Sequence, residues 1–332
     1  MTSVKPRERV FAALAHKEAD RVPRFEIWID ALLDELGQRD LPSTYVNLGQ
    51  DGIMLPNHLP RESNAWKEGV DEWGRVWQGG MYVDGVVDTV ADLEQYSPPL
   101  DYAAQMFDPD AIRRVRARYP DHCLIYGAHI GPFTAGYMAM GFERFFLRLA
   151  DDPGFVHRLL EARTAWCLAM FRQAVRLGAE VLVLGDDAGH REGPMISPRM
   201  WRKFVWPHHR RIVEEAGAPV IWHSDGNVDA LLPMAIEAGF VGFHSLEPAA
   251  GMDLGRIKRE FGRDLALVGN VDVRVLFEPD LDAVRREVDR CLAQGAPGGG
   301  YLLASCNSIF AGMNPSAVAE MFRYAGEVGF YA

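Results

Sequence analysis

The sequence has no long apolar run, no basic block and few cysteines. Nothing in its 332 residues approaches the roughly 18 consecutive apolar residues of a membrane-spanning helix, and the charged N-terminus lacks the apolar core of a signal peptide. The formal net charge is −11, and Lys and Arg form no dense cluster. Because nucleic acids and anionic membranes attract clustered cations, neither is an expected partner.

Cysteine use also restricts the class of protein. The four cysteines, Cys123, Cys167, Cys291 and Cys306, are scattered without a CxxC spacing. This pattern is typical of reduced thiols rather than of a disulfide framework, and we expect a cytoplasmic protein. The chain has no internal repeat, low-complexity tract or flexible linker. We therefore predict a single domain spanning residues 1–332.

From about residue 120 onward, short apolar runs alternate with segments of helical periodicity. The runs lie at residues 123–127, 179–185, 218–223, 240–245, 265–269 and 301–305. Apolar strands that alternate with amphipathic helices are typical of a parallel sheet covered by helices. Two further strands are predicted upstream, at Val22–Ile29 and Gly52–Leu55.

Eight strands in alternation predict an α/β fold, a closed (β/α)8 TIM barrel. A doubly wound sheet is the alternative, but no GxGxxG turn follows any strand. We expect a leading helix over Lys5–Lys17 and a small inserted β-hairpin over Glu72–Val87. The stretch Pro132–Leu177 predicts two helices separated near Pro153.

Polar residues follow several of the predicted strands, where a TIM barrel carries its active site. In chain order they are Asp186, Asp187, His223, Asp225, His244, Glu247, Asn270, Asp272 and Cys306. Strand-end Asp and His often only cap helices and loops, but capping does not call for a histidine and a cysteine on one rim. We therefore expect these side chains to meet at the mouth of the barrel.

Two chemistries fit this set. In the first, the side chains surround a divalent metal ion, and zinc is favoured because it accepts N, O and S ligands. The ligands would then be His223, Asp225, Glu247 and Cys306. In the second, no metal is bound, and Asp186 or Asp187 performs acid–base catalysis together with His223. The residues alone leave both open.

Aromatic and imidazole side chains near the expected mouth favour a modest apolar substrate. The predicted substrate contacts are Trp28, Phe133 and His190. Aromatic residues serve more often in core packing than in ligand contacts, so each is weighed against that role. The pair His208-His209 lies in a helical run and is expected at the surface or in a groove.

Several short motifs occur in a definite order along the chain. They are Pro6-Arg7-Glu8-Arg9-Val10, Asp20-Arg21-Val22-Pro23, Gly131-Pro132-Phe133-Thr134, Gly185-Asp186-Asp187-Ala188-Gly189, His223-Ser224-Asp225-Gly226-Asn227 and Gly269-Asn270-Val271-Asp272. Each alone is weak, but the ordered set spans nearly the whole chain and resembles the uroporphyrinogen-decarboxylase superfamily. The resemblance implies a (β/α)8 barrel, in agreement with the strand count.

One branch of this superfamily, the true uroporphyrinogen decarboxylases, binds substrate carboxylates through arginines of an N-terminal loop. The matching stretch here, Phe25–Leu32, has no arginine and carries Glu26 and Asp30. Acidic side chains there would repel an octacarboxylate rather than clamp it. Uroporphyrinogen is therefore not the expected substrate, and a cofactor-free decarboxylase acting on a small acid or tetrapyrrole is kept as the alternative.

The chain also resembles the other branch, methyltransferases whose zinc is held by a His-x-Cys pair and a distant Cys. His223 and Cys306 match the first and last positions, whereas Asp225 stands where the middle cysteine would be. A carboxylate makes a harder site, which suits activation of an ether oxygen or hydroxyl better than of a thiol. The resemblance thus implies a metal-dependent methyltransferase, with O-demethylation of a small methoxylated substrate favoured.

The resemblance also implies a corrinoid protein or another acceptor as partner. The chain has no corrinoid-binding Asp-x-His-x-x-Gly motif, so a corrinoid would be carried by a separate protein that docks over the barrel mouth. In this hypothesis the catalytic residues are Asp186, Asp187, Asn270 and Asp272. Asp186 and Asp187 move protons or orient substrate, and Asn270 forms a hydrogen bond within the pocket. A homodimer is the default expectation for such barrels. A catalytically retired barrel that only binds a ligand is the non-enzymatic alternative.

Overall fold

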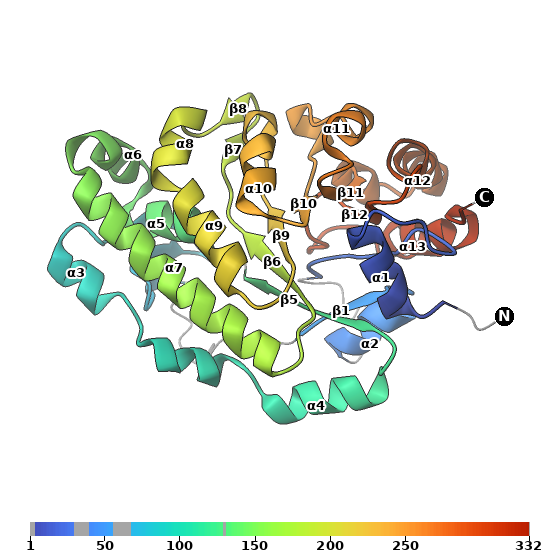
Figure 1. The fold of residues 1–332 in the computed structure, drawn as a ribbon, viewed down its shortest axis with the longest axis horizontal. Coiled ribbons are helices and arrows are strands. Elements are labelled where there is room, and N and C mark those ends of the chain that lie inside the picture. Colours follow the sequence, from blue (N-terminus) through green and yellow to red (C-terminus); the bar gives the residue numbers. More distant parts are fainter. Residues whose placement is uncertain (1–3, 30–39, 56–67, 129–130, 332) are drawn as a thin grey trace.

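A parallel sheet surrounded by helices forms the centre of the molecule (Figure 1). The computed structural model describes residues 4–29, 40–55, 68–128 and 131–331. Within these residues the sheet has seven strands, in the order β1-β5-β6-β9-β10-β11-β12, and every neighbouring pair is parallel. The strands are β1 Gly52–Met54, β5 Cys123–Ala128, β6 Val181–Gly185, β9 Val220–His223, β10 Gly242–His244, β11 Ala266–Val271 and β12 Tyr301–Ser305.

The extended segment 22–29 closes the ring between β12 and β1. On the β12 side, Leu303 N donates to Pro23 O at 2.9 Å, and Phe25 N donates to Leu303 O at 2.8 Å. On the β1 side, Asp51 N donates to Arg24 O at 2.8 Å. The predicted (β/α)8 barrel is therefore confirmed, and segment 22–29 occupies the eighth strand position through isolated bridges.

Helices lie around the outside of the strands, as Figure 1 shows for α7, α9, α12 and α13. The helices are α1 Pro6–Leu14, α2 Leu41–Asn47, α3 Val90–Gln95, α4 Pro109–Arg118, α5 Pro132–Met140, α6 Phe142–Asp151, α7 Pro153–Arg176, α8 Pro198–Phe204, α9 Trp206–Glu215, α10 Leu232–Ala238, α11 Leu254–Phe261, α12 Leu281–Gly295 and α13 Pro315–Val328. Many begin with a capping side chain followed by proline, as Asp152 does for α7. The leading helix is confirmed as α1. No helix in the described ranges is both long and apolar enough to cross a bilayer.

The region Pro132–Leu177 contains three helices rather than the two predicted. The break before Pro153 lies where it was expected, between α6 and α7. A second break separates α5 from α6 at Gly141, whose φ of 91° is a conformation that residues with a Cβ rarely adopt. A single glycine inside a helical pattern gave too weak a signal to predict this boundary.

The predicted hairpin is confirmed by β3 Arg75–Gln78 and β4 Met81–Gly85, which pair antiparallel. A short strand, β2 Gly69–Val70, adds to its edge. The hairpin packs closely on α5 at Gly85, where a Cβ would run into the backbone of Met138 and Ala139. This contact holds the insertion against the helix that begins next to the candidate site.

Replacing Gly85 by alanine is expected to lower the free energy of unfolding by about 1–3 kcal/mol, because the new methyl group overlaps helix backbone that cannot easily move. Urea denaturation followed by circular dichroism measures the change. Gly193→Ala is the matched control, since its methyl group would meet no atom of the described residues within 4 Å. Equal stabilities of the two variants would contradict this packing.

Candidate functional site

The carboxyl ends of β6, β9 and β10 meet at one edge of the barrel. In the register of these neighbouring strands, Gly185 lies opposite His223 and His223 lies opposite His244. The residues that follow Gly185 and His223 therefore leave the sheet side by side. This places Asp187 and Asp225 within reach of the His223 ring, as the strand-end pattern predicted.

The two histidines of β9 and β10 are in direct contact. Their Nδ1 atoms lie 2.6 Å apart, and His244 Nε2 lies 3.0 Å from the carbonyl oxygen of Ser305. Burial, with a smaller effect of His223, lowers the pKa of His244 well below its usual range, so this ring is neutral. Its Nε2 must then donate to Ser305, and its Nδ1 must accept from His223. His223 consequently carries a hydrogen on Nδ1, and its Nε2 is the ring nitrogen left for a ligand.

Two carboxylates face that nitrogen. His223 Nε2 lies 3.8 Å from Asp187 Oδ1 and 3.7 Å from Asp225 Oδ1, and the ligand atoms of the three residues all lie within 4.8 Å of one another. Two donors that each approach zinc to about 2.0–2.2 Å lie at most about 4.4 Å apart. Both distances from His223 are therefore short enough for one shared ion.

Asp225 is held with one oxygen turned to this space. Asn307 Nδ2 donates to Asp225 Oδ2 at 2.8 Å, whereas Oδ1 is buried and accepts no hydrogen bond from the described residues. The nearby Ser245 hydroxyl donates instead to Ser224 O. Burial and, to a smaller extent, the charge of Glu247 raise the pKa of Asp225 to about 6. A buried oxygen without a donor, beside an imidazole nitrogen, fits a bound cation.

Asp187 is fixed through its neighbours on both sides. Its backbone N donates to Thr134 Oγ1 at 2.8 Å, and its Oδ1 accepts from Asp225 N at 3.0 Å. Burial raises its pKa. Trp28 completes the surroundings, because its ring meets the His223 ring edge-on with centroids 4.8 Å apart.

Asp186, the neighbour of Asp187, points into the protein instead. It is fully buried and accepts from Thr134 N at 2.7 Å, Phe133 N at 3.3 Å and His209 Nε2 at 2.7 Å. It therefore fixes the start of α5 to α9. The expectation that His209 lies at the surface or in a groove is wrong, because this carboxylate gives the imidazole a buried partner.

The other predicted site residues lie outside the group formed by Asp187, His223 and Asp225. Cys306 is buried, and burial raises the pKa of its thiol to about 12. Asn270 donates to Leu246 O at 2.8 Å and accepts from Arg290 at 3.0 Å. Asp272 binds Arg274. Burial is the largest influence on the pKa of Asp272 and raises it, but the hydrogen bonds and charge of Arg274 together outweigh burial and lower the pKa. These contacts hold the ends of β11 and β12.

Two further predictions concern residues near the mouth. Phe133 is fully buried, and its ring packs on Trp201 with centroids 5.1 Å apart, so its contacts are those of the core. Glu26 is also fully buried and accepts from Ser305 N and Oγ, at 2.9 Å each. The argument that Glu26 would repel an anionic substrate is therefore wrong, because the side chain is turned to β12. Asp30 lies outside the described residues.

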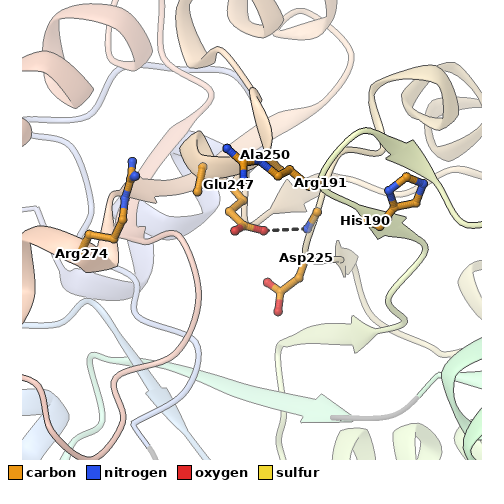
Figure 2. A pocket seen from close by; sticks show the side chains of 9 residues that line it. His190, Arg191, Asp225, Glu247, Ala250 and Arg274 are labelled. Atoms are coloured by element: carbon orange, nitrogen blue, oxygen red, sulfur yellow. Dashed lines mark hydrogen bonds between the residues drawn. The ribbon is translucent and has the colours of Figure 1, made fainter.

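A cavity of about 370 Å³ opens beside the group (Figure 2). Its labelled lining residues are His190, Arg191, Asp225, Glu247, Ala250 and Arg274. Glu247 Oε2 accepts from Gly226 N at 2.9 Å, which anchors the loop that carries Asp225. The exposed His190 lies at the rim, where it was expected.

Sequence reasoning gave little weight to His244 and missed Arg191. The signal for His244 was present, because β9 and β10 are consecutive and each ends in histidine. Arg191 joins two strands of two residues each, β7 Gly189–His190 and β8 Gly193–Pro194, which are too short to give a periodic pattern.

Comparison with known proteins supports the resemblance in the motifs. The family model described as uroporphyrinogen decarboxylase (URO-D) matches residues 72–328. The chain belongs to the uroporphyrinogen decarboxylase family. The recognition of this superfamily from the order of short motifs is thus confirmed.

The chain is similar both to a methyltransferase and to uroporphyrinogen decarboxylases. A methylated-thiol–coenzyme M methyltransferase of Methanosarcina mazei is 29% identical over 187 residues, which are 56% of this chain and 49% of that protein. The matched part of the chain thus spans about half the length of this relative. A uroporphyrinogen decarboxylase of Pseudomonas fluorescens is 26% identical over 260 residues, 73% of this chain and 70% of that protein.

A solved structure shows the same fold over nearly the whole chain. A methyltransferase from Methanosarcina mazei superposes with a TM-score of 0.78 at 21% sequence identity, covering 98% of this chain and 99% of that one. At this identity the superposition demonstrates the fold, and the chemistry must be argued from the site.

Proposed function

We propose that this chain is a metal-dependent methyltransferase. It would move a methyl group between a small methylated molecule, a methoxylated one being favoured, and a corrinoid protein or another acceptor. The observation that carries the proposal is the group of Asp187, His223 and Asp225, in which an imidazole nitrogen lies close to two carboxylates, one with a buried oxygen. The similarity to a methyltransferase over 187 residues supports the same choice.

The three residues form a hard donor set of one nitrogen and two carboxylates, which suits zinc. Zinc held there would polarise the heteroatom that carries the methyl group. The chain's own contribution is orientation: His244 and the Ser305 carbonyl set the His223 tautomer, and Asn307 turns Asp225. Cys306 and Glu247, also predicted as ligands, are not needed for this set.

Decarboxylation is the second candidate, favoured by the alignment with a decarboxylase over 73% of this chain. The stretch Phe25–Leu32 still offers no arginine for substrate carboxylates. We therefore expect no turnover of uroporphyrinogen by the purified protein.

Methyl transfer is tested directly with free cob(I)alamin as acceptor and a panel of methoxylated aromatic and aliphatic compounds. Formation of methylcobalamin, followed by its absorption spectrum, is expected and should stop when a chelator removes the metal. Decarboxylation of a tetrapyrrole by the protein, without methyl transfer from any donor, would contradict the proposal.

Replacing His244 by leucine is expected to weaken metal binding about 10–100-fold, because His223 loses the acceptor that keeps its hydrogen on Nδ1. Competition with a chelating dye measures the affinity. His244→Gln retains an acceptor and a donor, so it should lose less. Equal affinities of wild type and His244→Leu would rule out this orienting role.

A further inference from the structure

The cavity beside the proposed ligands contains an arginine with no carboxylate partner in the described part of the chain. Arg191 is exposed, and no Asp or Glu oxygen of those residues lies within 4.0 Å of its guanidinium. The other cavity arginine differs, because Arg274 donates to both oxygens of Asp272, at 2.9 Å to Oδ1 and 2.5 Å to Oδ2. One unneutralised cation therefore lines a cavity that otherwise carries the carboxylates of Asp225 and Glu247.

The backbone that carries Arg191 is fixed relative to Asp225. Arg191 lies in the turn between β7 and β8, and Asn227 N donates to His190 O at 2.8 Å. Gly189 and Gly226 lie so close that a Cβ on either would overlap the other's backbone. Arg191 thus lies on a hairpin whose backbone is hydrogen-bonded to, and closely packed against, the loop that carries Asp225.

Arg191 and Asp225 point in different directions in this cavity, and Figure 2 draws the Glu247 carboxylate between them. Figure 2 shows Arg191 reaching from the hairpin across to Ala250, while the carboxylate of Asp225 points to the opposite side. The small side chains of Ala249 and Ala250 leave space next to the guanidinium. An anionic group in this cavity would be repelled by the carboxylates of Asp225 and Glu247 and attracted by the guanidinium of Arg191.

We propose that the substrate of this site is a small methylated acid, whose carboxylate or sulfonate group is bound by Arg191. This inference rests on the proposed methyl transfer and names the class of substrate for it. The arginine fork pairs with two oxygens of such a group, which orients the methyl-bearing end towards Asp187, His223 and Asp225. Arg191 is then the residue that selects acids over neutral analogues.

The test uses matched pairs of an acid and its neutral amide: methoxyacetate with methoxyacetamide, and 4-methoxybenzoate with 4-methoxybenzamide. Isothermal titration calorimetry of the metal-loaded protein measures each affinity. In at least one pair the acid should bind about tenfold or more tightly, as expected for one charge-assisted contact at an exposed site. Arg191→Ala should abolish this preference and leave amide binding unchanged, and added salt should reduce it.

Arg199→Ala is the matched control, because this exposed arginine lies on α8 outside the cavity and should leave the preference intact. The absence of an acid preference in every pair, or its persistence in Arg191→Ala, would overturn the inference. Metal content and methyl transfer to cob(I)alamin are measured on the same preparations. If metal binding and methyl transfer persist without an acid preference, the inference alone fails; if both are absent from wild type, the proposed function fails.

Discussion

Alanine at position 223 should abolish metal binding while the barrel stays folded. His223 supplies the only nitrogen in the group with Asp187 and Asp225, and two carboxylates alone bind zinc weakly. We expect the affinity to fall by more than about 100-fold, since even residues that only orient a ligand contribute 10–100-fold. Elemental analysis after dialysis measures the metal, and circular dichroism verifies the fold.

His190→Ala is the control for this experiment. Its imidazole also lines the cavity, but it is exposed and lies outside the three-residue group. Metal content should stay at the wild-type level in this variant. If His223→Ala retained as much metal as His190→Ala, the ligand assignment would be wrong.

The second prediction with a large expected effect concerns the free energy of unfolding rather than metal binding. Asp186→Ala should lower the free energy of unfolding by about 3–5 kcal/mol, because it leaves Thr134 N, Phe133 N and the His209 ring buried without their acceptor. Urea denaturation measures the change. The account predicts a clear loss of stability even when no metal is present.

Asp187→Ala separates the two adjacent acids. Its side chain is partly exposed, so we expect a change in unfolding free energy within about 1 kcal/mol together with a marked loss of metal affinity. The reverse result, with a stable Asp186→Ala variant and an unfolded Asp187→Ala variant, would contradict the roles assigned to the pair.

The barrel could be predicted because its strands produce apolar runs that recur regularly along the sequence. Apolar runs at regular spacing identify buried strands, and even the irregular segment 22–29 was located by its apolar residues, although it pairs only through isolated bridges. The break at Gly141 escaped prediction because one glycine has many structural uses. Periodicity therefore predicted the sheet better than it predicted helix boundaries.

The sequence predicted which positions at the strand ends carry the candidate site, but not the direction in which each side chain points. Asp186 and Asp187 are adjacent in sequence, yet one is fully buried against α5 and α9 while the other faces His223. Side chains at a strand end turn as the chain leaves the sheet, and the sequence contains no signal for that turn. Arg191 could not be predicted for the same reason, since its place depends on how the hairpin packs against the loop after β9.

The most direct test of the central claim is elemental analysis of the full-length wild-type protein, purified without exposure to a chelator. The account predicts about one zinc ion per chain, as for a single site built from Asp187, His223 and Asp225. A folded, stable protein that contains no metal, and takes up none when zinc is added, would contradict it. The alternative, acid–base catalysis by Asp186 or Asp187 together with His223, would then replace the metal site.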